Sequence, residues 1–239
     1  MPDKPIFALC FWVMFSILIG VSDPSAASGP LETLQQKVDQ AINVLTDPRY
    51  TGNDDVRESQ QENRLWEILL GIFDFREFSR RVLARNWLEF SSEQQDEFVE
   101  YFSQFLRNYY LSRLQRRYKN ESVNYLSEKI VDDSRAVVKV EVLWNKRAIP
   151  VDIWMLKRNG NWKVYDLSFL GISAVKNYRA QFNALMETRT PVQVIAMVKE
   201  KADQSKKEIE TMSDRSFKRP NGLSMAELVL ADGRLINWI

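Results

Sequence analysis

The spacing of the apolar residues switches from a helical to a strand-like period close to Asn120. Before this point they recur every three or four positions, as in amphipathic helices, and after it they alternate with polar residues, as in strands with one buried face. Helical spacing resumes after Gly171. This order predicts, for a chain of 239 residues, an α+β domain with N-terminal helices, an antiparallel sheet meander and C-terminal helices. Such a sheet can curl against helices and enclose an apolar cavity.

Four helices are predicted ahead of the sheet. Their apolar positions fall within residues 31–45, 65–72, 75–83 and 98–114, and the last of these helices is long and rich in aromatic residues. Two pairs of residues, Asp74 with Glu77 and Ser92 with Gln95, have the spacing of capping boxes, which predicts that helices begin there.

Three strands are predicted, at about residues 136–143, 148–157 and 162–167. Asn159-Gly160 separates the last two and is the strongest short-range signal for a hairpin turn. Two further helices follow, one over residues 175–186 and one that begins at Thr190-Pro191.

The N-terminal residues resemble an export signal. An uncharged apolar run from Ile6 to Val21 precedes the small residues Ser25-Ala26-Ala27, which predicts a signal peptide over residues 1–27 and a location outside the cytoplasm. An uncleaved membrane anchor is the alternative. The remaining chain is interpreted as a domain over residues 28–210. Residues 211–239 are predicted to form a disordered or locally packed extension, or one that docks on the domain or on a partner.

Composition excludes several kinds of chemistry. The chain has no histidine, which removes Ser-His and Cys-His nucleophile pairs and histidine-ligated metals, and its single cysteine, Cys10, lies within the apolar run. A net charge of +1 gives no general signal for binding nucleic acid. Neither a glycine-rich phosphate loop nor an acidic metal motif occurs. We therefore expect no catalytic residue, no cofactor and no bound metal.

Several segments resemble the periplasmic phospholipid-binding family called MlaC, or the toluene-tolerance family. The resemblance runs from about Leu31 to Glu208, and Ala84 stands where the family usually has glycine. The segments that carry it are Phe75-Arg76-Glu77-Phe78 with Val82-Leu83-Ala84-Arg85-Asn86-Trp87, Ser91-Ser92-Glu93-Gln94-Gln95, Pro150-Val151-Asp152-Ile153-Trp154, Gly160-Asn161-Trp162-Lys163-Val164-Tyr165-Asp166, Gly171-Ile172-Ser173 and Asn177-Tyr178-Arg179-Ala180-Gln181-Phe182.

The resemblance implies a soluble carrier that moves phospholipid across the periplasm and maintains the lipid asymmetry of the outer membrane. Its implied partners are an outer-membrane lipoprotein complex and an inner-membrane ABC transporter. The residues expected to contact lipid are apolar positions of the long helix, the strands and the following helix, although an ordinary close-packed core is an alternative role for each. They are Phe98, Phe102, Phe105, Tyr109, Val140, Val142, Ile153, Met155, Leu167, Phe169 and Phe182.

Other candidate residues have stronger structural interpretations. Asp152 and Asp166 match the family pattern and are expected to form structural hydrogen bonds. The cationic run contains Arg113, Arg116, Arg117 and Lys119. It is suited to lipid phosphates or an acidic partner, but cations also stabilise the last turns of a helix.

Two other functions remain open. A carrier of another lipid, such as a hopanoid or an isoprenoid, would have the same fold. An enzyme of the proton-transfer type would use a buried carboxylate and tyrosine, for which Tyr165 and Asp166 are the candidates. Adjacent residues of a regular strand point to opposite faces, which argues against a shared site for this pair.

Overall fold

A computed structural model of the chain describes residues 28–50, 55–144 and 147–214. The predicted signal peptide and most of the predicted extension lie outside these residues. The elements are α1 Pro30–Leu45, η2 Pro48–Tyr50, α2 Asp55–Ile72, α3 Phe75–Leu83, η3 Ala84–Glu89, α4 Ser92–Leu106, η4 Arg107–Leu111, α5 Ser112–Arg117, β1 Ser122–Asp132, β2 Arg135–Trp144, β3 Arg147–Arg158, β4 Asn161–Phe169, β5 Ile172–Ser173, α6 Ala174–Met186 and α7 Pro191–Asp214.

The strands form one antiparallel sheet in the order β1-β2-β3-β4-β5, which confirms the predicted meander and the α+β class. The hairpin at Asn159-Gly160 is also confirmed, since both residues have the positive φ angles, 48° and 81°, that this turn requires. A second two-residue turn at Leu170-Gly171 joins β4 to β5 in the same way, with φ angles of 50° and 83°.

Two strands, β1 and β5, were not predicted. β1 is an edge strand whose residues are mostly exposed, and its pairing with β2 shifts register between Tyr125 and Ser127. The shift changes which residues face inward, so no continuous alternation marks this strand in the sequence. β5 has two residues, too few to show any period.

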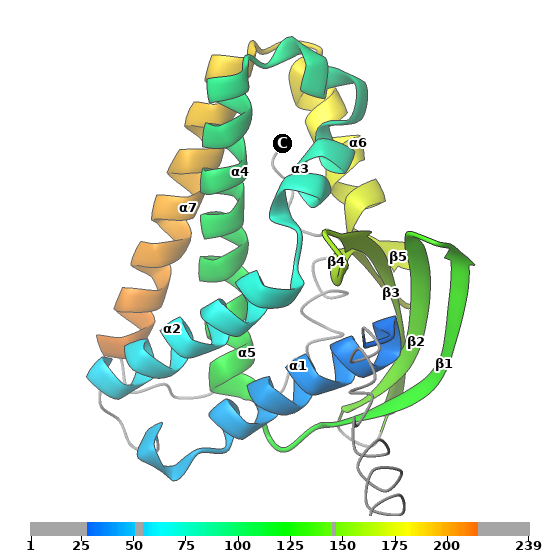
Figure 1. The fold of residues 1–239 in the computed structure, drawn as a ribbon. Helices are drawn as coiled ribbons and strands as arrows, with labels where there is room; N and C mark the ends of the chain where they lie inside the picture. Colours follow the sequence, from blue (N-terminus) through cyan, green and yellow to red (C-terminus); the bar gives the residue numbers. More distant parts are fainter. Residues whose placement is uncertain (1–27, 51–54, 145–146, 215–239) are drawn as a thin grey trace, which may run out of the picture.

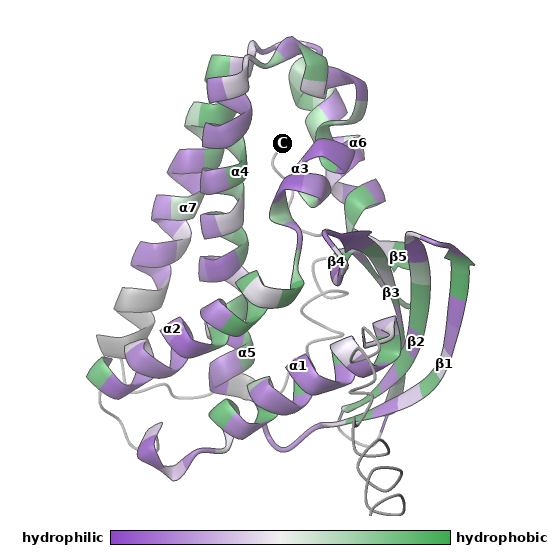
Figure 2. Cartoon of the chain, viewed as in Figure 1, coloured by the Kyte–Doolittle hydropathy of each residue, from purple (hydrophilic) through white to green (hydrophobic). Residues whose placement is uncertain are grey.

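The helices lie in two groups (Figure 1). α7 packs along α4, and α3 lies against α6. α1 lies against β1 and β2, whereas α2, α3 and α6 approach β4. Figure 2 shows hydrophilic residues along much of the visible surface of α4 and α7. The buried apolar residues form two clusters, one among the helices and one beneath the sheet.

The predicted long helix is present but is not uniformly α-helical. A five-residue π-helical segment, η4, lies between α4 and α5. The capping box at the start of α4 is also one residue earlier than predicted, because Ser91 and Gln94, not Ser92 and Gln95, make the reciprocal contacts. Gln95 instead donates from Nε2 to the backbone carbonyls of Trp87 and Phe90.

The predicted capping box at α3 forms only in part. The Asp74 carboxylate accepts a hydrogen bond from the backbone N–H of Glu77, 2.8 Å away. The N–H of Asp74, which the box would pair with the Glu77 side chain, donates to the carbonyl of Val164 on β4. Glu77 is thereby left to bind arginines.

Ala84 ends α3 in a conformation that glycine adopts readily and alanine does not. Its φ and ψ angles are 51° and −118°. These values match the first central residue of a type II′ turn, a position that glycine dominates because it has no Cβ. The structure thus explains why glycine is suited to this position.

Candidate functional site

The inner face of the sheet and the helices beneath it form one apolar cluster, which we call the sheet cluster. Its buried members are Leu34, Ile72, Ala136, Val138, Val140, Trp144, Ile149, Val151, Ile153, Met155, Trp162 and Val164. Its partly buried margin contains Leu31, Val38, Leu69, Phe73, Val123, Tyr125, Val142, Leu167 and Phe169. The strand alternation that the sequence predicted for β2 and β3 produces this face.

The sheet cluster contains six of the predicted lipid-contacting residues. Val140, Ile153 and Met155 are buried within it, and the other three lie at its partly buried margin: Val142, Leu167 and Phe169. Val142 pairs with Val123 on β1 and with Ile149 on β3. The margin leaves apolar side chains partly accessible next to a buried apolar wall.

The remaining predicted residues belong to a second, helical cluster. Phe98, Phe102, Phe105 and Phe182 are buried there, and Tyr109 packs against them. The ring centroid of Phe102 lies 5.4 Å from those of both Phe98 and Phe182. Such spacing is that of a close-packed aromatic core, the alternative role considered for these residues.

The two clusters meet at Phe73, which packs against both. Phe73 forms an isolated bridge with Val164 of β4, and its ring lies 5.4 Å from that of Phe78 in the helical cluster. The eleven predicted residues therefore do not line one surface. The structure brings together the strand residues in one group and the helical residues in another.

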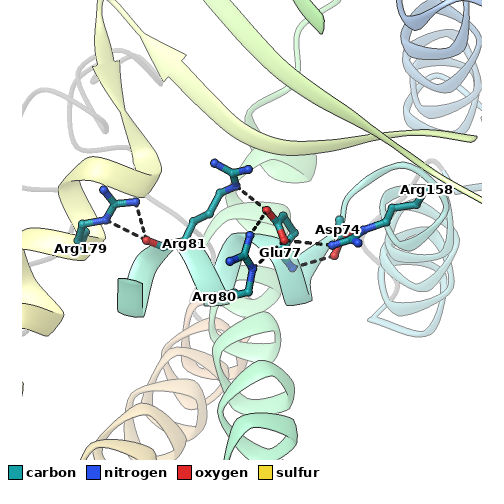
Figure 3. A network of polar contacts seen from close by, with 6 residues as sticks. All are labelled: Asp74, Glu77, Arg80, Arg81, Arg158 and Arg179. Atoms are coloured by element: carbon teal, nitrogen blue, oxygen red, sulfur yellow. Dashed lines mark hydrogen bonds and ion pairs between the residues drawn. The ribbon is translucent and has the colours of Figure 1, made fainter. Parts of the chain in front are cut away.

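A buried carboxylate lies beside this junction and was not predicted as more than a helix cap (Figure 3). The Glu77 side chain is 3% exposed and forms ion pairs with Arg80, Arg81 and Arg158 at distances of 2.7 to 3.1 Å. Burial alone would raise the pKa of Glu77, but the hydrogen bonds and charges of Arg80 and Arg81 outweigh it, and the pKa is lowered. This network joins α3 to the end of β3.

The Tyr165–Asp166 pair lies where β4 is irregular, so the premise of a regular strand is wrong. A register shift between Trp154 and Met155 leaves Tyr165 without a partner on β3. Even so, Asp166 is occupied: Oδ1 accepts from the backbone N–H groups of Leu167 and Val175, and Oδ2 accepts from Ser173 Oγ at 2.6 Å.

Tyr165 makes a different contact. The guanidinium carbon of Arg81 lies 4.0 Å from the centre of the Tyr165 ring. Burial raises the pKa of Tyr165, which keeps its hydroxyl protonated. Asp166 and Tyr165 are therefore engaged separately, one at the start of α6 and the other with α3.

The other charged candidates face outward or pair with acidic groups. Asp152 lies opposite Lys139 on β2, with Oδ1 3.7 Å from Nζ. Arg116 pairs with Glu58 of α2 at 2.5 Å, and Arg113 lies over the Tyr109 ring and 3.7 Å from Glu208. The side chain of Arg117 is not among those described. Arg113 and Arg116 thus join helices to one another.

Sequence reasoning missed the polar atoms buried in the sheet cluster. Tyr125 Oη and Trp144 Nε1 have no hydrogen-bond partner among the described residues. The only signal in the sequence was the presence of a tyrosine and a tryptophan, and residue type does not reveal whether their polar atoms are paired. Within the described ranges, no group of three or more acidic or cysteine side chains is placed to hold a metal ion.

Within residues 28–50, 55–144 and 147–214, none of the helices has the length and apolar character needed to cross a bilayer. A solved structure resembles most of this part of the chain. It is similar to the phospholipid-binding protein of Ralstonia solanacearum, solved in complex with a phospholipid, with a TM-score of 0.65 and 23% identity over 74% of this chain and 99% of that one. This likeness shows a shared fold.

The sequence comparisons agree with the fold. The intermembrane phospholipid transport system binding protein MlaC of Haemophilus influenzae is 26% identical over 102 residues, which are 41% of this chain and 47% of that protein. The match thus spans about half the length of this curated relative. A family model described as MlaC protein matches residues 35–200, well over half of the sequence. The chain therefore belongs to the MlaC protein family.

Proposed function

We propose that this chain is a soluble periplasmic carrier that binds phospholipid and exchanges it between membranes. The family supports this proposal, as do the phospholipid transport role in the name of the Haemophilus influenzae relative and the phospholipid bound to the Ralstonia solanacearum protein. The predicted export signal and the absence of histidine fit a periplasmic protein that performs no acid–base chemistry.

The observation that carries the proposal is the apolar inner face of the sheet, with its partly buried margin. The helices contact the sheet mainly at β1, β2 and β4. β3 therefore lies between the strands that α1 contacts and the strand that α2, α3 and α6 contact. The partly accessible apolar side chains at the margin of the sheet cluster can contact an acyl chain in place of one another.

Transfer free energies explain why a carrier needs only such a surface. A buried CH₂ group is worth about 0.8 kcal/mol, so an acyl chain of roughly sixteen carbons costs about 12 kcal/mol to place in water. An apolar site comparable to the bilayer interior makes transfer nearly neutral. The direction of transport would then be set by partner affinities or by ATP hydrolysis, and we propose an outer-membrane lipoprotein complex and an inner-membrane ABC transporter as these partners.

A proton-transfer enzyme is the weaker alternative. Asp166 already accepts three hydrogen bonds, one from Leu167 on β4 and two from Ser173 and Val175 at the start of α6, and these bonds favour a structural role for this carboxylate. The Tyr165 ring is covered by Arg81. No second pair of a buried carboxylate and a tyrosine was predicted.

The proposal is tested by the lipid that the protein carries when it is purified from a bacterial periplasm. Organic extraction followed by mass spectrometry should yield phospholipid in stoichiometric amount, with little preference among headgroups because most of the contact area is apolar. A preparation without stoichiometric lipid, from protein shown to be folded by circular dichroism, would contradict the proposal.

A further inference from the structure

Two hydrogen-bond donors are buried in the sheet cluster without a partner. They are the indole Nε1 of Trp144, whose residue is 7% exposed, and the hydroxyl of Tyr125. In the part of the chain that the structure describes, the only other buried side-chain polar atom without a partner is an acceptor, Gln115 Oε1 on α5. Buried polar groups in proteins are nearly always paired, so these two donors require an explanation.

Both donors lie on the inner face of the sheet. Tyr125 pairs with Val140 across β1 and β2, and Val123 pairs with Val142. Because side chains alternate along a strand, Val140, Val142 and Trp144 point to the same face as Tyr125. The backbones at Val140 and Trp144 are about 13 Å apart at about 3.3 Å per residue, so the two donors occupy separate positions on one wall.

Among the described residues, no acceptor lies within hydrogen-bond distance of either donor. Trp144 pairs with Arg147 on β3, whose guanidinium can only donate, and the next residues on this face, Val142 and Ile149, have apolar side chains. Burial, together with the negative charge of Asp39 on α1, raises the pKa of Tyr125 to about 12, so its hydroxyl keeps its proton. An indole N–H can only donate, and it therefore needs a partner that accepts.

A lipid with acyl esters has both apolar chains, which suit the apolar side chains of the sheet cluster, and oxygen acceptors, which suit the two unpaired donors. Its chains match the apolar side chains, and each ester carbonyl accepts hydrogen bonds without donating any. The hydrocarbon part of a hopanoid or an isoprenoid has no such oxygen and would leave both donors unpaired. The donors thus discriminate between the cargo classes that the sequence left open.

We propose that Trp144 and Tyr125 donate hydrogen bonds to acyl-ester carbonyl oxygens of a lipid held against the sheet cluster. This inference rests on the proposed phospholipid carrier and extends it, because it assigns two specificity-determining residues and names ester-linked lipids as the preferred cargo class.

The test compares two phospholipids that have the same headgroup and chain length, one with ester and one with ether linkages. Ether-linked lipid lacks the carbonyls, so wild-type protein should bind the ester-linked lipid about tenfold more tightly, as expected for one or two buried hydrogen bonds. Trp144→Phe and Tyr125→Phe should each lose much of this preference. Trp162→Phe is the matched control, because Trp162 is equally buried in the sheet cluster but its nitrogen is not among the unpaired atoms, and it should keep the preference.

Lipid-free Tyr125→Phe supplies a second measurement. It removes one unpaired polar atom and retains the ring, so its unfolding temperature should equal or exceed that of lipid-free wild type. A clearly lower temperature would show that water already satisfies the hydroxyl and would overturn the inference.

The affinities separate failure of the inference from failure of the proposed function. Equal wild-type affinity for both lipids would overturn the inference but leave the carrier intact. Retained preference in both Trp144→Phe and Tyr125→Phe would also overturn it. Failure of folded wild-type protein to bind either lipid would refute the proposed function itself.

Discussion

Replacing Ala84 with glycine should stabilise the protein, although most substitutions to glycine destabilise. Ala84 has φ and ψ angles of 51° and −118°, where a Cβ atom is disfavoured. Backbone conformations of this kind cost about 1–3 kcal/mol for a residue other than glycine. Ordering glycine on folding costs about 0.5–1 kcal/mol more conformational entropy than ordering alanine. The net stabilisation by Ala84→Gly should therefore be about 1 kcal/mol.

The matched control is Ala180→Gly, an exposed position in the interior of α6. Glycine there should destabilise by about 1 kcal/mol, because it lowers helix propensity without relieving strain. Thermal unfolding followed by circular dichroism should show a Tm about 2–4 °C above wild type for Ala84→Gly and a similar decrease for Ala180→Gly. If both variants lowered the Tm equally, Ala84 would not occupy the strained conformation, and the account of the α3 terminus would be refuted.

Further predictions concern the sheet, the ion network and the start of α6. Val142→Asp at the margin of the sheet cluster should abolish lipid retention while the protein still folds. The control Leu143→Asp, on the opposite face and 41% exposed, should change neither lipid retention nor folding. Unfolding of Val142→Asp would assign Val142 to a close-packed core. Glu77→Gln should destabilise by about 3 kcal/mol, because three arginines lose their buried anion. The pKa of Glu77 is lower in the folded state than in the unfolded state, where it is 4.5. Its ion pairs therefore stabilise the protein fully above pH 4.5, and this stabilisation is lost as the pH falls through the folded pKa. The free energy of unfolding should thus fall less with acid in Glu77→Gln than in wild type, and identical dependence on pH in the two proteins would contradict this. Ser173→Ala should lower stability by about 1 kcal/mol in thermal unfolding, because its hydroxyl caps α6, and an unchanged Tm would argue against that role.

Local signals in the sequence were sufficient for most of the fold. Asn159-Gly160 predicted its hairpin because the turn conformation depends on the two residues themselves. β1 was missed because it is stabilised by pairing with β2 and is largely exposed, so its own sequence shows no clear alternation. The cap of α4 was placed one residue late for a related reason, since both Ser91-Gln94 and Ser92-Gln95 have the required spacing.

The candidate site was harder to predict because periodicity identifies a buried face but not what that face contacts. Val140 and Phe102 both lie on apolar stripes, yet one is in the sheet cluster and the other in the helical cluster. The binding role of all eleven residues stays a prediction. The unpaired atoms of Tyr125 and Trp144 depend entirely on tertiary neighbours, which no local pattern encodes.

The most direct test of the carrier account is transfer of a fluorescent phospholipid from donor to acceptor vesicles. The account predicts that transfer accelerates in proportion to the concentration of protein, and that protein separated from the vesicles carries the fluorescent lipid. A transfer rate that is independent of protein, together with separated protein that carries no lipid, would contradict it.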